Sequence, residues 1–244
     1  MATVAKIAAR GGTAERVACA DWSEIARELN ESGHATIRGA LDGLACEELR
    51  GFYRQSAMFR SRVVMARHGF GQGEYQYFAY PLPPRIADLR EELYQRLAPV
   101  ANLWAEALCS EARYPATLGS FLTDCHAQGQ LRPTPLLLKY AAGDYNRLHQ
   151  DLYGGVQFPL QATVLLSAGG DFDGGEFVLT ETAPRRQTRV EVVPLTQGDM
   201  VIFAVNYRPV RSAKGFARVA MRHGVSTVRH GARMTLGLIF HDAT

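Results

Sequence analysis

The sequence predicts a mainly β protein with a helical layer, an α+β fold in which N-terminal helices pack on one sheet of a double-stranded β-helix (jelly roll). From Pro135 onward, short apolar segments alternate with turns rich in Gly, Asp and Pro, a pattern typical of two facing sheets. Before that point, apolar residues recur at helical spacing. The 244 residues can bury a full-sized core, and no internal repeat or low-complexity linker divides them, so we expect one structural domain.

The N-terminal half is expected to support the jelly roll. Residues 1–14 are small and polar and predict a flexible N-terminus. Within the domain, 15–244, we expect a buttress of helices and a few strands over 15–133 and the jelly-roll core over 134–244. Trp22 begins the apolar face of a first helix that ends at Gly33, and Asp42 caps a second helix.

A long helix is expected to begin near Pro84, because isoleucine and leucine side chains then share one face. Pro99 should kink or split this helix, since proline removes a backbone hydrogen bond. A further helix spans about 116–127. Upstream, residues 61–67 look extended, and the aromatic run 74–80 is strand-like by residue type.

Composition and charge limit the protein's class. The net charge is +3 and the pI is about 8.7, which is too mildly basic to argue for nucleic-acid binding by itself. No apolar run approaches the length of a membrane span, and the N-terminus lacks the apolar stretch of a leader peptide. The cysteines show no metal-type pairing and read as reduced thiols: Cys19, Cys46, Cys109 and Cys125. We therefore expect a soluble, cytoplasmic protein that does not associate with membranes.

The triplet His149-Gln150-Asp151 is the first candidate for chemistry. If it is extended, the two-residue period of a strand places His149 and Asp151 on one face, where an imidazole nitrogen and a carboxylate oxygen converge. Such a pair is two-thirds of the facial triad that leaves positions open on a non-haem Fe(II) ion. Alone the triplet is weak, because a histidine and an aspartate that simply hydrogen-bond on a strand give the same pattern.

Two downstream residues strengthen the metal interpretation. His223 supplies a third ligand type, and Arg233 follows ten positions later. A turn at 229–231 would place the two on adjacent antiparallel strands of one hairpin, with both side chains in the same cavity. A guanidinium suits bidentate capture of a carboxylate. The bland alternatives are a strand histidine with a local partner and a surface arginine at a strand end.

With these residues the chain resembles the 2-oxoglutarate/Fe(II)-dependent oxygenases, and within them the prolyl-4-hydroxylase-like branch. The resemblance covers roughly residues 134–243. Over most of its length the chain is also similar to a bacterial group identified as 2-oxoglutarate/Fe(II) oxygenases, some with a damaged-DNA label. Four pieces stand in the family's order: Tyr140-x-x-Gly143-x-Tyr145 before His149-x-Asp151; Ala162–Leu166 before Gly174-Gly175-Glu176; Gly198–Phe203; and His223…Val228…Gly231-x-Arg233.

The resemblance implies an enzyme that uses Fe(II), O2 and 2-oxoglutarate and releases succinate and CO2. His149, Asp151 and His223 are then the metal ligands and catalytic residues. Arg233 is implied to bind the C5 carboxylate of 2-oxoglutarate, with Thr235 and Tyr140 as further hydroxyl donors. Tyr140 is equally well explained as a core aromatic. Four other histidines have no ligand-spaced partner or read as structural or solvated: His68, His126, His230 and His241.

The primary substrate is the least readable feature. Tyr75, Tyr77, Tyr80, Arg60, Arg62 and Arg67 belong to the strands expected on the substrate side. They either line the mouth of the site or form an aromatic core strand with a solvated basic edge.

Two substrate classes remain: a protein side chain or small molecule that is hydroxylated, and an alkylated nucleic acid that is oxidatively demethylated. Alkylated-DNA demethylases carry another arginine six residues after the 2-oxoglutarate arginine. Ile239 stands there in this chain, which favours hydroxylation. A metal protein of the cupin kind, which would show His-x-His and a nearby Glu, is the alternative outside the oxygenases.

Overall fold

The computed structural model describes residues 12–244 and confirms the predicted jelly roll with a helical layer. Most of the expected flexible N-terminus lies outside the described residues, and the first helix, α1 (Thr13–Ala18), begins at its end. Four further helices are α2 (Trp22–Ser32), α3 (Gly43–Phe52), α4 (Pro84–Ala107) and α5 (Leu118–Ala127), and two short 3-10 turns are η1 (Ser56–Met58) and η2 (Met65–His68).

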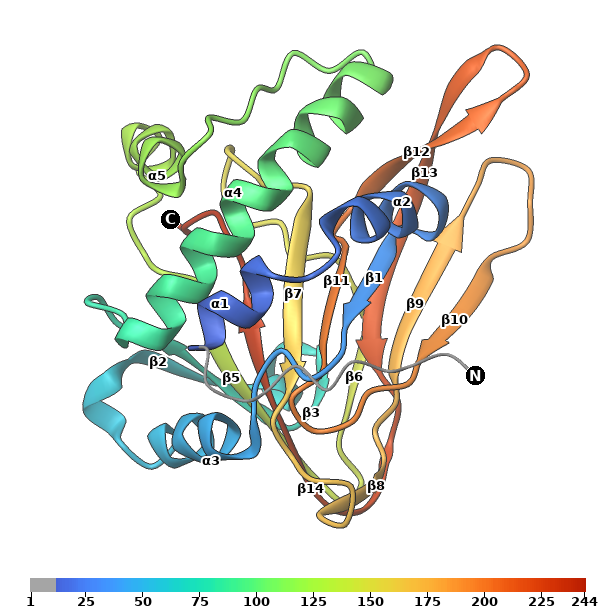
Figure 1. Cartoon of the computed structure of the whole chain (residues 1–244). Helices are drawn as coiled ribbons and strands as arrows, with labels where there is room; N and C mark the ends of the chain where they lie inside the picture. Colours follow the sequence, from blue (N-terminus) through green and yellow to red (C-terminus); the bar gives the residue numbers. More distant parts are fainter. Residues whose placement is uncertain (1–11) are drawn as a thin grey trace, which may run out of the picture.

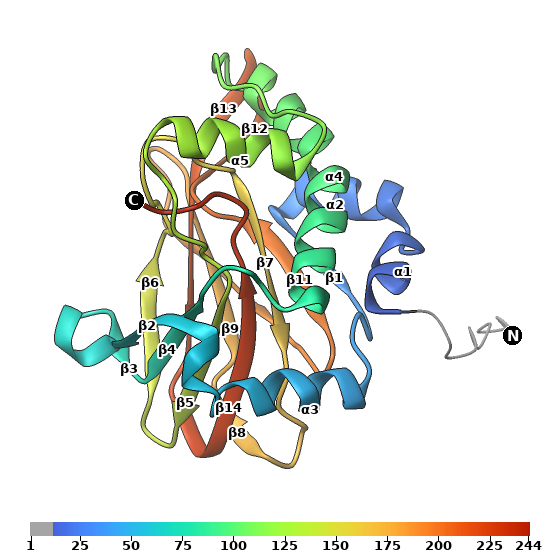
Figure 2. The same ribbon diagram turned by 90° about the vertical axis from the view of Figure 1, so that its left-hand side faces the viewer.

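The strands form two antiparallel sheets that lie against each other (Figures 1 and 2). The larger sheet has the order β1 (His34–Ile37), β11 (Met200–Ala204), β7 (Leu160–Leu165), β14 (Val228–Leu238), β5 (Leu136–Ala141), β4 (Glu74–Phe78) and β2 (Phe59–Val64), with β8 (Phe172–Gly174) beside β14. The smaller sheet has the order β10 (Arg189–Val193), β9 (Phe177–Thr182), β13 (Gly215–Val225), β6 (Tyr145–His149) and β3 (Gly71–Gln72), with β12 (Tyr207–Ser212) beside β13.

The helices cover the larger sheet and share its hydrophobic core (Figure 2). Leu93 and Leu97 of α4 belong to the same buried cluster as Val164 of β7 and Leu236 of β14. Fully burying a leucine side chain contributes roughly 1.5–3 kcal/mol, so this layer holds the sheet firmly in place. None of the described helices is long and apolar enough to cross a bilayer.

Helix α4 continues through Pro99, so the predicted split does not occur. A proline interrupts one backbone hydrogen bond, but the apolar face continues on both sides of it. Leu97, Ala101 and Trp104 are all buried against the core. Burial of this face therefore outweighs the lost hydrogen bond.

One local expectation also needs correction: the extended segment predicted over 61–67 ends at Val64, and η2 follows. The turn at Gly198-Asp199, before β11, does not close a hairpin, because β10 and β11 lie in different sheets. The carboxylate of Asp199 explains the turn: it accepts hydrogen bonds from the backbone of Gly39 and Thr196 and from Arg38.

Candidate metal and cosubstrate site

His149, Asp151 and His223 meet between the two sheets. Their ligand atoms all lie within 4.8 Å of one another. His149 and His223 are directly opposite each other on β6 and β13, and their ring centroids are 4.2 Å apart. Asp151 comes after the end of β6, so the strand period alone does not place it. The three side chains form the only metal-type cluster of this size found within residues 12–244.

The carboxylate of Asp151 stands between the two imidazoles. Oδ1 lies 3.5 Å from Nε2 of His149, and Oδ2 lies 3.3 Å from Nε2 of His223. Burial alone would raise the pKa of Asp151, but its hydrogen bond to His223 and the two neighbouring imidazoles hold that pKa well below its usual value. Asp151 therefore carries an anionic carboxylate at neutral pH.

In both imidazoles Nε2 faces the carboxylate of Asp151. Nδ1 of His149 lies 2.7 Å from the carbonyl oxygen of Arg147, which fixes Nδ1 as the protonated nitrogen. Burial lowers the pKa of His223, so its ring is neutral. Two neutral imidazoles and one carboxylate are the donor set of a 2-His-1-carboxylate site, and their convergence fits Fe(II).

Two residues that the sequence analysis did not identify hold the Asp151 carboxylate. The Tyr153 hydroxyl donates to Oδ1 at 2.8 Å, and Nε2 of Gln161 donates to Oδ2 at 2.8 Å. Burial, followed by the charge of Asp151, raises the pKa of Tyr153 and keeps it a neutral donor. Tyr153 repeats the two-residue spacing after Asp151, but Gln161 lies on β7 of the opposite sheet, and nothing in its sequence context indicates this contact.

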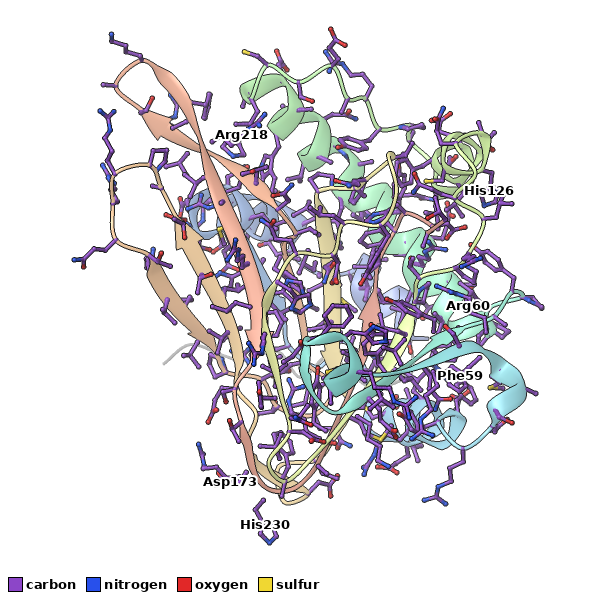
Figure 3. All side chains as sticks on the ribbon, turned by 180° about the vertical axis from the view of Figure 1, so that it is seen from behind. Phe59, Arg60, His126, Asp173, Arg218 and His230 are labelled. Carbon is purple, nitrogen blue, oxygen red and sulfur yellow. The ribbon has the colours of Figure 1, made fainter. Side chains whose placement is uncertain are left out.

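Arg233 lies across the cavity from the triad rather than on a strand paired with His223. The predicted hairpin is wrong: β13 belongs to the smaller sheet and β14 to the larger one. The chain turns at 226–227, and His230 lies within β14 opposite Asp173 of β8 (Figure 3). Arg233 and His223 nevertheless line the same cavity, because their strands face each other across it.

The Arg233 guanidinium is buried without an anionic partner. The residue is 2% exposed, and Nε and Nη1 have no hydrogen-bond partner among the described residues. Burial lowers the pKa of Arg233 to about 10, so it still carries its charge at neutral pH. An unpaired buried charge is strongly unfavourable, and a carboxylate ligand would relieve it.

Tyr140 and Thr235 lie beside this guanidinium. Tyr140 is the direct cross-strand neighbour of Arg233, whose Cζ stands 5.8 Å from the centre of the tyrosine ring. The buried Tyr140 hydroxyl also has no partner among the described residues. Thr235 lies two residues after Arg233 on β14 and lines the same cavity. The three side chains together offer donors for one carboxylate.

The glycine turn after β8 closes against Arg233. Gly175 has a φ of +64°, and a Cβ there would lie 2.8 Å from Cδ of Arg233 and 2.8 Å from Cγ2 of Val228. Both the backbone conformation and the lack of space require glycine. The Gly174-Gly175 turn thus supports the position of Arg233 directly.

The triad and the Arg233 group share one cavity of about 190 Å³. The cavity walls between the triad and Arg233 are largely apolar and include Leu136, Leu138, Phe177, Phe203 and Ile239. Apolar walls strengthen the electrostatic interactions inside by excluding water.

The aromatic and basic residues expected near the mouth divide into separate roles. Tyr75 lines the cavity, and Tyr77 donates to the Tyr153 hydroxyl at 3.1 Å, while Tyr80 bonds to Asp242 instead. Cζ of Arg60 lies 4.5 Å from the centre of the Tyr77 ring. In contrast, Arg62 pairs with Glu74, and Arg67 is exposed.

The other histidines lie outside the metal cluster. Nδ1 of the buried His241 accepts a hydrogen bond from the backbone of Phe158, and burial lowers its pKa to about 4. Nε2 of His126 lies 3.0 Å from Asp242. His68 stacks on Phe70, with ring centroids 5.3 Å apart. These contacts agree with their interpretation as structural or solvated residues.

Solved structures of 2-oxoglutarate oxygenases share this fold. A prolyl-4-hydroxylase from Pseudomonas putida superposes with a TM-score of 0.52 at 16% identity, covering 88% of this chain and 96% of that one. A 2OG-Fe(II) oxygenase family oxidoreductase from Burkholderia pseudomallei gives a TM-score of 0.53 at 16% identity, covering 93% of this chain and 94% of that one. At this identity the likeness concerns the fold.

Sequence comparison defines the family. An uncharacterized protein of Mycobacterium tuberculosis is 47% identical over 167 residues, which is 68% of this chain and 72% of that protein. The model of the Oxygenase-NA family, described as "Oxygenase, catalysing oxidative methylation of damaged DNA", matches residues 73–243. The chain therefore belongs to the Oxygenase-NA family of oxygenases and has the fold of 2-oxoglutarate/Fe(II)-dependent oxygenases.

Proposed function

We propose that this protein is a 2-oxoglutarate- and Fe(II)-dependent dioxygenase in which His149, Asp151 and His223 hold the metal and Arg233 binds the cosubstrate. The observation that carries the proposal is the buried guanidinium of Arg233, which has no anionic partner and faces the same cavity as the triad. A dicarboxylate that reaches from the metal to Arg233 satisfies both ends of this cavity.

Each side chain then has a definite task. An iron ion held by His149, Asp151 and His223 would supply oxidation of a substrate C–H bond by O2, coupled to conversion of 2-oxoglutarate to succinate and CO2. Arg233 pairs with the C5 carboxylate, and a hydrogen bond of this charge-assisted kind contributes roughly 1.5–3 kcal/mol. The hydroxyls of Tyr140 and Thr235 donate to the same carboxylate. Tyr153 and Gln161 orient Asp151 through the hydrogen bonds described above.

The test is binding of 2-oxoglutarate to the iron-loaded protein under anaerobic conditions, followed by succinate release in air. We expect 2-oxoglutarate to bind only when Fe(II) is present and to give a metal-to-ligand charge-transfer band. His149→Ala and His223→Ala should abolish the band. Binding of 2-oxoglutarate that is unaffected by these substitutions would contradict the proposal.

The first substrate candidate is a protein side chain or small molecule that becomes hydroxylated. Ile239 lines the cavity with an apolar side chain, at the position where the demethylase pattern requires arginine. A cavity of about 190 Å³ suits a compact group. Succinate release screened with peptides and metabolites tests this candidate.

The second candidate is oxidative demethylation of alkylated nucleic acid, and the family description, which names damaged DNA, favours it. A hydroxylated N-methyl group releases formaldehyde, so this reaction uses the same oxidation. The target base must leave the stack to reach the cavity. Formaldehyde release from alkylated oligonucleotides distinguishes this candidate from the first.

A further inference from the structure

The hairpin of β12 and the first part of β13, residues 207–218, projects beyond the rest of the molecule as an arm (Figure 1). The loop between β9 and β10 lies near the base of this arm, because Thr182 at the end of β9 pairs with Ala220 of β13. Both segments are basic. Eight arginines and lysines and two acidic residues lie between positions 183 and 222, a net charge of +6 against +3 for the whole chain.

Most of these cations have no carboxylate partner. Arg208 and Arg189 pair with Glu181 and Glu191. The other six are exposed and form no ion pair with any described residue: Arg185, Arg186, Arg211, Lys214, Arg218 and Arg222. Elsewhere on the surface, arginines commonly pair with neighbouring acidic groups, as Arg27 does with Glu24. Uncompensated charge concentrated on one segment creates a field that attracts an anionic partner.

Aromatic rings are interleaved with these cations on one face of the arm. Arg211 and Phe216 are direct cross-strand partners and therefore point the same way, and Arg211 Cζ lies 5.4 Å from the Phe216 ring centre. Arg218 Cζ lies 4.9 Å from the ring centre of Tyr207. Both rings remain accessible, with Tyr207 39% and Phe216 46% exposed.

This face continues onto the outside of the smaller sheet. Arg222 alternates with His223 along β13, so it points outward where His223 points into the metal site. Arg222 pairs with Thr180 of β9, which pairs with Val190 of β10, and Val190 is 59% exposed. Figure 3 shows Arg218 on β13 near the end of α4, and Ala101 and Trp104 of that helix line the same groove as Arg218.

The base of the arm borders the segment that carries the metal ligand Asp151. Tyr207 and Arg218 line a groove of about 310 Å³ with Leu152 and Gln157. The side chain of Gln150 donates to the backbone carbonyls of Asn206 and Met221, which ties this segment to β12 and β13. A polymer bound along the arm thus lies next to the loop that forms one wall of the site.

We infer that the arm, with Arg185, Arg186 and Arg222 beside it, is a docking surface for the phosphodiester backbone of a nucleic acid. Repeated cations without partners match a regular line of phosphates. The exposed rings of Tyr207 and Phe216 offer stacking platforms for unpaired bases, which favours single-stranded segments. A β-ribbon is also a known shape for a nucleic-acid contact. A nucleic acid bound here would be the substrate of the second candidate function, oxidative demethylation, and the link between this surface and catalysis rests on that proposed function.

The test measures binding of fluorescent single-stranded and duplex oligonucleotides by anisotropy, without iron or 2-oxoglutarate, over a range of salt concentrations. The arm variant carries Arg211→Glu, Lys214→Glu and Arg218→Glu. The control variant carries Arg54→Glu, Arg96→Glu and Arg113→Glu, which makes the same charge change at exposed positions on other parts of the surface. A milder arm variant with glutamine at the same three positions guards against misfolding.

We expect the arm variant to raise the dissociation constant at least tenfold and the control variant to change it much less. Loss of three phosphate contacts should reduce the slope of log affinity against log salt by about 2–3, since each contact contributes about 0.7–0.9. Tyr207→Ala and Phe216→Ala should weaken single-stranded binding more than duplex binding.

Equal loss in the arm and control variants would overturn the inference, because it would indicate general charge attraction. So would equal competition by polyglutamate or by phosphatidylserine vesicles at matched charge, which would indicate an acidic protein or a membrane surface. Failure of the proposed catalytic function can be distinguished from failure of the docking surface. If no succinate is released, the binding result still stands. If binding depends on the arm but no formaldehyde is released, the docking surface is retained and the demethylase candidate is removed.

Discussion

The Tyr153 hydroxyl donates to Oδ1 of Asp151 at 2.8 Å and itself accepts a hydrogen bond from Tyr77 at 3.1 Å. This short chain connects the metal-site carboxylate to the aromatic strand β4. Removing a group that orients a metal ligand without contacting the metal typically lowers metal affinity by about 10- to 100-fold. We therefore expect Tyr153 to position Asp151 for metal binding.

Tyr153→Phe should raise the dissociation constant for Fe(II) by about 10-fold or more, because Asp151 loses one of the two donors that fix its orientation. Metal titration under anaerobic conditions measures the effect. Tyr80→Phe is the matched control, since its hydroxyl bonds to Asp242 rather than to a triad residue. Equal metal affinity in wild type and Tyr153→Phe would refute the positioning role.

Arg233→Ala should leave Fe(II) binding nearly intact and raise the dissociation constant for 2-oxoglutarate on the order of 10- to 100-fold, from a lost pair worth roughly 1.5–3 kcal/mol. Arg233→Lys should recover only part of this, because an ammonium makes no bidentate contact. Arg229→Ala, an exposed arginine of the same strand paired with Asp173, is the control. Asp151→Ala should instead lower metal and cosubstrate binding together.

Arg233→Met should stabilise the protein in the absence of 2-oxoglutarate. The substitution replaces a buried cation that has no partner among the described residues with an apolar side chain of similar length. Thermal unfolding with and without Fe(II) and 2-oxoglutarate measures this. Wild type should gain stability from 2-oxoglutarate, whereas the variant should start higher and gain little. A lower unfolding temperature of the ligand-free variant would contradict the account of Arg233.

Gly175→Ala should weaken 2-oxoglutarate binding without affecting Fe(II) binding, because the new Cβ meets Cδ of Arg233 and the backbone φ is +64°. Gly170→Ala is the control, since a Cβ there has no atom within 4 Å and no left-handed backbone requires glycine. Isothermal titration of both variants provides the comparison. Similar cosubstrate affinity in the two would show that the turn does not position Arg233.

Asp199 should make stability depend on pH at the acidic end. Burial alone would raise its pKa, but the donors from Thr196, Gly39 and Arg38 hold the folded-state pKa below its usual value. The stabilisation is therefore fully present above the unfolded-state pKa of about 3.9 and is lost as pH falls through the lower folded-state pKa. Unfolding free energies of wild type and Asp199→Asn should differ by a constant amount above about pH 5 and converge below about pH 4.

The sequence by itself determined the fold class and the chemical types present in the site. Alternating short strands predicted two facing sheets, and a histidine, an aspartate, a second histidine and an arginine at their spacings indicated a metal with a carboxylate ligand. These features depend on local periodicity and on side-chain chemistry, which a single chain displays directly. The long helix was also predicted, although burial on both sides of Pro99 overrode the expected break.

Only the tertiary structure decided how these groups face one another. His223 and Arg233 lie on opposite sheets because the two-residue connection after Val225 passes from one sheet to the other, and the sequence of a short turn does not distinguish this from a hairpin. Gln161 reaches Asp151 across the cavity, and the unpaired state of Arg233 exists only once its surroundings are assembled. The same holds for the arm, where cross-strand pairing places Tyr207 and Phe216 on one face with Arg211 and Arg218. Contacts between distant strands depend on the register and stacking of whole sheets, which local sequence patterns do not encode.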